Sequence, residues 1–282
     1  MDMMTQGTEW SQIPASEIDL RLVVADMDGT LLTDEGTVPE DFWPLLRELT
    51  ERGIVFVPAS GRQYATLAEL FDHAGYPLSY IAENGNLVMH HNEPIFTASL
   101  SEDTVRKGIE ATRGAASQRN LGLVLCGQAS AYVERGDEEF LAEAGKYYRK
   151  LEVVQDLTQV QDTFFKLAIH DFDDSQQAFD QIYAPFAEEH QVVISGQRWL
   201  DIMRTDIDKG RAVRALQERM AVTPAQTAVF GDYLNDLQML AAGELSFAMA
   251  NAHPQIKQAA TYAAPANSEN GVTRVLAHLL GG

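Results

Sequence analysis

The sequence contains little cysteine, few basic side chains and no long apolar run, and each shortage excludes a class of protein. The single cysteine, Cys126, cannot form an intramolecular disulfide, and this usage fits a reducing compartment. No window reaches about 18 consecutive apolar residues, so we expect no membrane-spanning helix. Residues 1–20 include acidic side chains and lack the apolar core of a signal peptide. We therefore expect a soluble, cytoplasmic protein.

The shortage of basic side chains makes the chain strongly acidic. Its 282 residues include 41 Asp and Glu but 21 Lys and Arg, which gives a formal net charge of -20. A field of this sign repels nucleic acid and anionic membranes, so we expect neither as a partner, and no obligate protein partner is evident. The same field repels phosphorylated substrates, so a phosphate site would need cations close by. Hydrophobic residues make up 45% of the chain, which is ample for a buried core.

Among the features that are present, two carboxylates after an apolar run are the most informative. The run Leu22–Ala25 has the length and composition of a buried strand, and it leads into Asp26 and Asp28 before a Gly-Thr turn at Thr30. Residues two apart share one side of an extended strand, and the ends of parallel strands form ligand-binding crevices. The pair suits a hard metal such as Mg²⁺, a nucleophile beside an acid–base group, or simply the capping of a turn.

Three later segments also place polar groups where a predicted strand ends or a predicted helix begins. Ser60-Gly61-Arg62 follows the strand 54–57 and suits either anion binding or an ordinary helix cap. Lys209 begins a predicted helix, where a lysine is usually a surface residue, although an ammonium facing phosphate and carboxylates would be strongly stabilised. The strand 228–230 is followed by Asp232, Asn235 and Asp236, and these residues suit either a hard metal or a helix N-cap.

The order of the predicted elements indicates an α/β protein divided in sequence by an insertion. Strands alternate with helices in the first third of the chain and again after residue 209, which favours a parallel sheet with right-handed crossovers. The middle of the chain has the pattern of a compact α+β unit. We expect an N-terminal extension over 1–20, a first core segment over 21–84, an inserted domain over 85–197 and a second core segment over 198–282.

The four polar segments, in this order, resemble the four motifs of the haloacid dehalogenase-type phosphatases. The matching residues are Asp26-Met27-Asp28-Gly29-Thr30, Ser60-Gly61-Arg62, Lys209-Gly210 and Gly231-Asp232-x-x-Asn235-Asp236. The insertion between the second and third motifs resembles the cap domain of the Cof-type subgroup, as do Asn84-Gly85 and Met249–Ala252. Segments 82–88 and 126–133 resemble a bacterial sugar phosphatase of that subgroup. The resemblance implies a Rossmann-like parallel-sheet core with an inserted α+β cap domain.

The resemblance also implies a Mg²⁺-dependent phosphatase that acts on sugar phosphates or related small phosphomonoesters. Asp26 would attack phosphorus to form an aspartyl-phosphate, and Asp28 would protonate the leaving alcohol and then activate water. Mg²⁺ would be held by the Asp26 carboxylate, the Asp28 backbone carbonyl and Asp232, with Asn235 or Asp236 in support.

The remaining motif residues would bind the phosphoryl group or support the loops. Phosphoryl oxygens would be held by Ser60, the Gly61 N–H, Lys209 and Asn235. Thr30 would orient the loop or Asp28, and Arg62 would support the site. Three further polar residues suit either contact with the substrate or a structural role, namely Asn84, Arg198 and Trp199. Two other activities use similar groups, a phosphomutase on sugar phosphates and a phospho-acceptor signalling domain.

Overall fold

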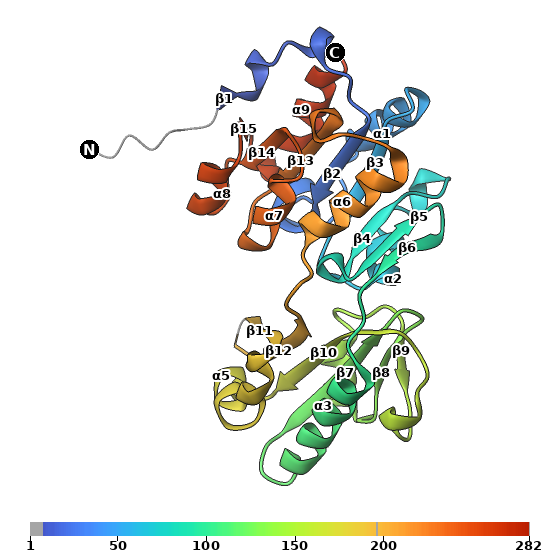
Figure 1. Cartoon of the computed structure of the whole chain (residues 1–282), viewed down its shortest axis with the longest axis vertical. Coiled ribbons are helices and arrows are strands. Elements are labelled where there is room, and N and C mark those ends of the chain that lie inside the picture. Colours follow the sequence, from blue (N-terminus) through green and yellow to red (C-terminus); the bar gives the residue numbers. More distant parts are fainter. Residues whose placement is uncertain (1–7, 196, 282) are drawn as a thin grey trace, which may run out of the picture. The chain divides into compact units, whose positions relative to one another are not determined.

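The computed structural model of the chain describes residues 8–195 and 197–281, which form two compact units (Figure 1). The first unit, named the core, comprises residues 8–61, 67–97 and 208–281. The second unit, named the insert, comprises residues 62–66 and the described residues of 98–207. Each unit has a β-sheet of its own.

The core is built on a mixed sheet whose strands follow the order β1-β15-β14-β13-β2-β3-β4-β5-β6. In this order the strands from β1 to β4 are parallel, and β5 and β6 continue as an antiparallel hairpin. Their bounds are Thr8–Glu9 (β1), Leu22–Asp26 (β2), Val55–Ala59 (β3), Tyr80–Ala82 (β4), Leu87–His90 (β5), Glu93–Thr97 (β6), Thr227–Gly231 (β13), Leu245–Met249 (β14) and Tyr262–Ala264 (β15).

The three central strands bring their carboxyl ends to one edge of the core sheet. β2 is buried along its whole length, as the apolar run Leu22–Ala25 predicts. Ala25 pairs with Phe230 of β13 on one side, and Asp26 pairs with Ala59 of β3 on the other. Because the two neighbours of β2 come from opposite ends of the chain, β2 lies where the strand order reverses, which is where open α/β sheets bind ligands.

The core helices contribute apolar faces to the interior. α1 buries residues at spacings of three and four, which places them on one side of the helix, namely Phe42, Leu45, Leu46 and Leu49. α1 packs against β3 and α9, whereas α6 packs against α7 (Figure 1). The bounds are Phe42–Glu51 (α1), Tyr64–Glu69 (α2, which begins in the insert), Lys209–Met220 (α6), Leu237–Leu240 (α7), Pro254–Ala259 (α8) and Gly271–Leu279 (α9).

The described residues of the N-terminal segment belong to the core. β1 pairs in parallel with β15, and the Trp10 ring packs edge-on against His278 of α9 with 5.5 Å between ring centroids. The guanidinium of Arg274 lies over the same Trp10 ring at 5.8 Å. Residues 8–20 are therefore attached to the core, and residues 1–7 of the expected extension lie outside the described residues.

The insert is an α+β unit with a sheet in the order β11-β12-β10-β7-β8-β9. One side of this sheet packs against α3 through Leu167 and Ile169, and the alternating residue Ala168 joins a second cluster with Phe140 of α4. The bounds are Glu102–Ala115 (α3), Leu121–Gly127 (β7), Ala131–Val133 (β8), Glu138–Ala144 (α4), Leu151–Val153 (β9), Phe164–Asp171 (β10), Ser175–Ala178 (α5), His190–Ser195 (β11) and Trp199–Arg204 (β12).

The boundaries of the insert differ from the expected range 85–197. Residues 87–97 form the hairpin β5–β6, which extends the core sheet because Ile81 of β4 pairs with Val88. At the other end, β12 pairs with both β10 and β11 in the insert sheet, so the second core segment begins at Asp208 and not at residue 198. Both differences arise because backbone pairing between strands decides which sheet a hairpin joins, and side-chain pattern alone does not record that pairing.

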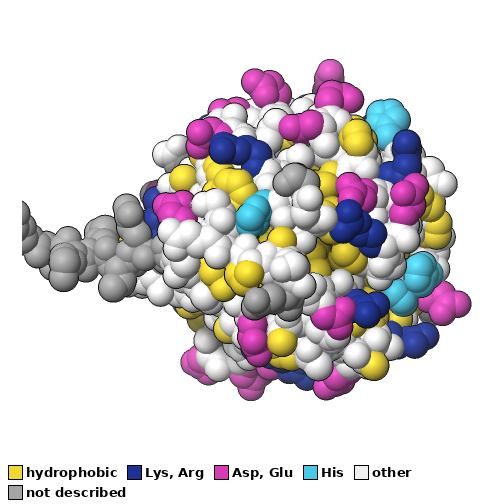
Figure 2. Space-filling model, turned by 90° about the horizontal axis from the view of Figure 1, so that it is seen from above, with side chains coloured by type: hydrophobic (Ala, Val, Ile, Leu, Met, Phe, Trp, Pro, Cys, Tyr) yellow, Lys and Arg dark blue, Asp and Glu magenta, His cyan; other side chains and the backbone are white. Residues whose placement is uncertain are grey.

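The described surface carries charges of both signs. Figure 2 shows acidic and basic side chains interspersed over the face seen from above. Exposed large apolar side chains among the described residues are Tyr147, Val153, Tyr233, Leu234 and Leu237. None of the helices in the described ranges combines the length and the apolar character needed to cross a bilayer.

Candidate active site

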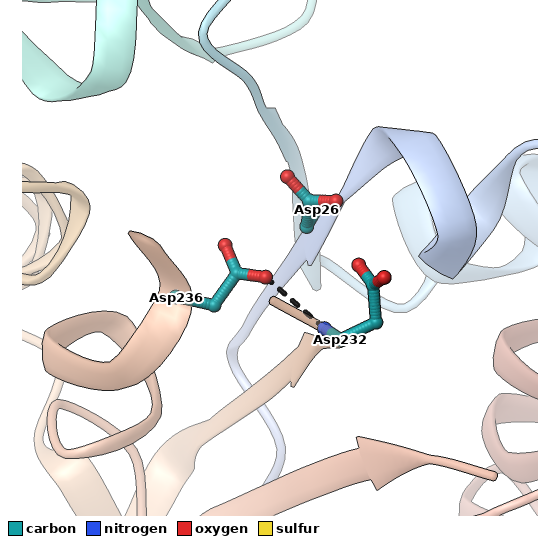
Figure 3. A group of neighbouring side chains, drawn as sticks. All are labelled: Asp26, Asp232 and Asp236. Atoms are coloured by element: carbon teal, nitrogen blue, oxygen red, sulfur yellow. Dashed lines mark hydrogen bonds between the residues drawn. The ribbon is translucent and has the colours of Figure 1, made fainter. Parts of the chain in front are cut away.

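Three aspartates meet at the carboxyl edge of the core sheet (Figure 3). Asp26 is the last residue of β2, and Asp232 and Asp236 belong to the loop that follows β13. One carboxylate oxygen from each lies within 4.8 Å of the others. Asp26 and Asp236 are buried and Asp232 is half-buried. The fold therefore brings together three carboxylates, although Asp26 and Asp236 are more than 200 residues apart along the chain.

A buried lysine is bound to two of these carboxylates. The Lys209 ammonium donates hydrogen bonds to Asp26 Oδ1 and, at 2.7 Å, to Asp236 Oδ1. Lys209 is the first residue of α6, whose N-cap is Asp208, because the Asp208 side chain accepts a hydrogen bond from Arg211 N at 2.8 Å. A cation at a helix N-terminus opposes the helix dipole, so the two carboxylates supply the attraction that holds this ammonium in the interior.

Burial and like charge raise the pKa values of the carboxylates. Burial is the main cause that raises the pKa of Asp26; the nearby Asp236 and Asp232 add to the shift, and the Lys209 ammonium opposes it. Burial also raises the pKa of Asp232. Burial alone would lower the pKa of Lys209, but the carboxylates of Asp26 and Asp236 outweigh it and raise that pKa, so Lys209 carries its charge.

This donor set fits a hard divalent cation. When all three carboxylates are ionised beside one ammonium, the cluster carries two excess negative charges, which a divalent cation such as Mg²⁺ would balance. Oδ1 of Asp26 accepts a hydrogen bond from Lys209, and Oδ1 of Asp232 accepts one from Thr30, so the protein itself holds both carboxylates in place. Oxygen ligands and charge balance together favour a magnesium-type ion over a soft metal.

Asp236 holds the loop after β13 in place. Its Oδ2 accepts hydrogen bonds from the backbone N–H of Asp232 at 3.0 Å and of Tyr233 at 3.2 Å, and its Oδ1 accepts from Lys209. Gly231 packs so closely on Asp236 that a Cβ at Gly231 would lie 2.6 Å from the Asp236 Cβ. Both oxygens of Asp236 therefore accept hydrogen bonds from the protein, one from Lys209 and the other from the loop.

Gly29 and Thr30 fix the orientation of Asp232. Thr30 Oγ1 donates a hydrogen bond of 2.9 Å to Asp232 Oδ1, so the contact lies with Asp232, whereas the sequence suggested the loop or Asp28. Gly29 has a φ of +76°, and a Cβ at this position would lie 2.5 Å from Asp232 Oδ2. Both the backbone conformation and the close approach therefore require glycine.

We predict that Gly29→Ala lowers both stability and activity, whereas Gly36→Ala lowers stability alone. Gly36 has the same φ of +76° but nothing within 4 Å of its Cβ position, so it shares the backbone cost, about 1 kcal/mol, without the clash. Thermal unfolding and kcat of both variants provide the comparison. Equal kcat in the two variants would show that the position of Asp232 does not depend on Gly29.

Two asparagines outside the four motifs also hold the loop that follows β2. Asn251 Nδ2 donates to the Gly29 carbonyl at 2.7 Å, and its Oδ1 accepts from Asn267 N at 3.2 Å. Asn267 Nδ2 in turn donates to the Leu32 carbonyl at 3.1 Å. The signal for Asn251 was its place in the segment 249–252, which resembles the Cof-type subgroup; Asn267 had no signal in the sequence.

The other predicted residues lie in several places. Asp28 is exposed, two residues beyond Asp26, and Ser60 is buried at the end of β3, where its N–H donates to the Ile81 carbonyl at 2.9 Å. Asn235 is also exposed, and the Nδ2 of Asn235 donates a hydrogen bond to Asn84 Oδ1 at 3.3 Å.

Arg62 lies between the first two stretches of the core, which end at Gly61 and begin again at residue 67. The insert therefore contains Arg62, and it also contains Arg198 and Trp199. The Trp199 ring packs edge-on against Tyr147 at 5.5 Å.

Comparisons with known proteins agree with this geometry. A sequence profile of the haloacid dehalogenase-like hydrolases matches residues 23–276. The 5-amino-6-(5-phospho-D-ribitylamino)uracil phosphatase YbjI of Escherichia coli is 30% identical over 266 residues, which cover 93% of this chain and 97% of that protein. YcsE of Bacillus subtilis, named for the same activity, is 23% identical over 266 residues, which cover 94% and 98%.

The fold gives the same result. A crystal structure of a protein from Eubacterium rectale superposes with a TM-score of 0.83 at 25% identity, covering 93% of this chain and 99% of that one. The matches extend over the core and the insert together, so the relationship concerns the whole architecture and not a single motif. The chain therefore belongs to the haloacid dehalogenase-like hydrolases and is a phosphatase of that superfamily.

Proposed function

We propose that the protein is a Mg²⁺-dependent phosphatase that hydrolyses sugar phosphates or related small phosphomonoesters through an aspartyl-phosphate intermediate. The observation that carries the proposal is the Lys209 ammonium, which is bound to Asp26 and Asp236 while Asp232 lies in the same carboxylate cluster. In this proposal Asp26 is the nucleophile, Lys209 supplies a fixed positive charge and the carboxylate cluster holds the cation, the groups on which phosphoryl transfer depends.

The chemistry needs two displacements at phosphorus. In the first, an Asp26 oxygen forms a bond to phosphorus as the bond to the leaving alcohol breaks, and Asp28 donates a proton to the departing oxygen. In the second, Asp28 takes a proton from water, whose oxygen bonds to phosphorus and releases Asp26 and inorganic phosphate. Asp28 suits this role because it is exposed and only two residues beyond the buried nucleophile.

The cation and the phosphoryl group have separate sets of ligands in this proposal. Asp26, Asp232 and the Asp28 backbone carbonyl would hold Mg²⁺, which when bound supplies positive charge next to the phosphoryl oxygens. The phosphoryl oxygens would be bound by Ser60, the Gly61 N–H, Lys209 and Asn235. Local cations thereby offset the repulsion expected between a phosphorylated substrate and a chain of net charge -20.

We predict that Thr30→Val raises the Mg²⁺ concentration for half-maximal activity by about tenfold or more. The Thr30 hydroxyl donates to Asp232 Oδ1, and loss of a hydrogen bond that orients a metal ligand typically weakens metal affinity about 10- to 100-fold. Thr37→Val is the matched control, since its exposed hydroxyl contacts Thr33 at 3.0 Å in the core. Titration of activity with MgCl₂ measures the effect; equal half-maximal concentrations in the two variants would show that Thr30 does not position a ligand of the cation.

The substrate proposal is supported by the relatives. YbjI and YcsE are named as phosphatases of 5-amino-6-(5-phospho-D-ribitylamino)uracil, a phosphate ester of a sugar-alcohol chain. The segments 82–88 and 126–133 resemble the bacterial sugar phosphatase SupH. Both likenesses point to a small polyhydroxylated leaving group, and hydroxyl-rich esters form the class that we propose.

A substrate screen with product analysis tests the function. Purified protein with MgCl₂ would be assayed for inorganic phosphate released from hexose and pentose phosphates, sugar-alcohol phosphates, nucleotides, flavin mononucleotide and pyridoxal phosphate. We expect release from the sugar and sugar-alcohol esters, and none when EDTA replaces MgCl₂. Release from no ester would overturn the proposal, and a hexose phosphate isomer formed without inorganic phosphate would identify a phosphomutase instead.

A further inference from the structure

A short turn outside the four motifs touches three of the loops that form the site. Residues 83–85 follow β4, and all three have positive φ, with +51° at Glu83, +55° at Asn84 and +100° at Gly85. A Cβ at Gly85 would lie 2.5 Å from the Asp208 carbonyl oxygen, directly before Lys209. Consecutive left-handed residues are costly and persist only where surrounding contacts hold them, so this turn is fixed by its neighbours.

Asn84 makes the contacts that reach the other two loops. Its backbone N–H donates to the Ser60 carbonyl at 3.0 Å, next to the expected phosphate-binding N–H of Gly61. Its carboxamide packs on Gly61, where a Cβ would lie 3.0 Å from both Nδ2 and Oδ1. Its Oδ1 accepts a hydrogen bond of 3.3 Å from Asn235 Nδ2. One side chain therefore joins the loop after β3 to the loop after β13, and all of these residues belong to the core.

We propose that Asn84 is a positioning residue for the phosphoryl group: its carboxamide sets the place of Asn235 relative to Gly61. This inference rests on the proposed function, in which Gly61 and Asn235 bind phosphoryl oxygens. Donors fixed in advance at the right separation spare the reaction the reorganisation of loops, and a misplacement of about 1 Å can cost about 100-fold in rate. Asn84 acts through Asn235 and Gly61 and not on phosphorus itself.

The conformation of Asn84 allows a clean removal of its side chain. Asparagine and glycine both tolerate the left-handed region, so Asn84→Gly keeps the backbone of the turn and deletes only the carboxamide. Asn92→Gly is the matched control, because Asn92 has a φ of +66° and is exposed in the β5–β6 hairpin of the same unit. A purely structural asparagine at position 84 would behave like Asn92.

The test combines kinetics with direct binding. We expect Asn84→Gly to lower kcat/KM for p-nitrophenyl phosphate about tenfold at saturating MgCl₂, with a melting temperature within a few degrees of the Asn92→Gly control. Asn235→Ala should lose a similar factor, and the double variant Asn84→Gly/Asn235→Ala should lose no more than the larger single loss, because the two residues form one unit. By calorimetry, Asn84→Gly should bind inorganic phosphate several-fold more weakly while its affinity for Mg²⁺ alone stays unchanged.

Three results would overturn the inference. The first is that Asn84→Gly keeps the kinetics and the phosphate affinity of the wild type. The second is that the losses of kcat/KM multiply to about 100-fold in the double variant. The third is that Asn84→Gly loses Mg²⁺ affinity in parallel with its phosphate affinity. Failure of the proposed function is a separate observation, since it would be seen in the wild-type enzyme as no release of phosphate. If the wild type binds inorganic phosphate without releasing it from any ester, the binding comparison still tests Asn84.

Discussion

Asp26→Asn should abolish turnover while the protein remains folded. The substitution keeps the shape of the side chain but removes the carboxylate that would attack phosphorus, and an amide oxygen is a poor nucleophile. Loss of a catalytic nucleophile typically lowers kcat by 10³-fold or more, so we expect at least about that factor with p-nitrophenyl phosphate. The fold should tolerate the change, because an amide oxygen at this position can still accept a hydrogen bond from Lys209, and Lys209 keeps its ion pair with Asp236.

Asp173→Asn is the control for this substitution. Asp173 is an exposed aspartate in the insert, after the strand β10, where the sequence also runs from apolar residues into acids. The control should retain wild-type kcat. Acid quenching after incubation with a ³²P-labelled sugar phosphate should trap label on the wild type and on Asp173→Asn but not on Asp26→Asn. Activity of Asp26→Asn above about a tenth of the wild-type value would rule out Asp26 as the nucleophile.

The sequence predicts those features of the site that are built by strand ends. An apolar run identifies β2, and the same reasoning identifies β3 and β13. Parallel strands share a carboxyl edge, so the aspartates at the ends of β2 and β13 must approach one another even though they are far apart in sequence. Their separation within 4.8 Å follows from the register that pairs Ala25 with Phe230.

The features that the sequence does not predict depend on contacts between side chains of different loops. Thr30 donates to Asp232 and Asn84 accepts from Asn235, and neither partner can be read from spacing along the chain. The range 85–197 expected for the insert includes the hairpin β5–β6, and only its pairing with β4 assigns the hairpin to the core. Short polar side chains at loops thus remain ambiguous until the tertiary partner is known.

Lys209→Ala should produce the second large effect, on activity and on stability together. Without the ammonium, Asp26 and Asp236 remain buried without their cationic partner, and breaking a buried pair in this way typically costs about 3–5 kcal/mol. The same ammonium would stabilise charge that develops on the phosphoryl oxygens, so we expect kcat/KM of the folded fraction to fall by about 10²- to 10³-fold, on the order of 3–4 kcal/mol.

Arg119→Ala separates these two effects. Arg119 is paired with the fully buried Asp171 in the insert, so its removal also breaks a buried ion pair, but away from the aspartate cluster of the core. Both variants should melt at lower temperature than the wild type, measured by circular dichroism at matched MgCl₂ concentrations. Arg119→Ala should keep the kcat/KM of its folded fraction, whereas Lys209→Ala should lose it. If the activity of Lys209→Ala fell only in proportion to the unfolded fraction, Lys209 would be a purely structural partner of the aspartates, and the positive charge for phosphoryl transfer would have to come from the cation alone.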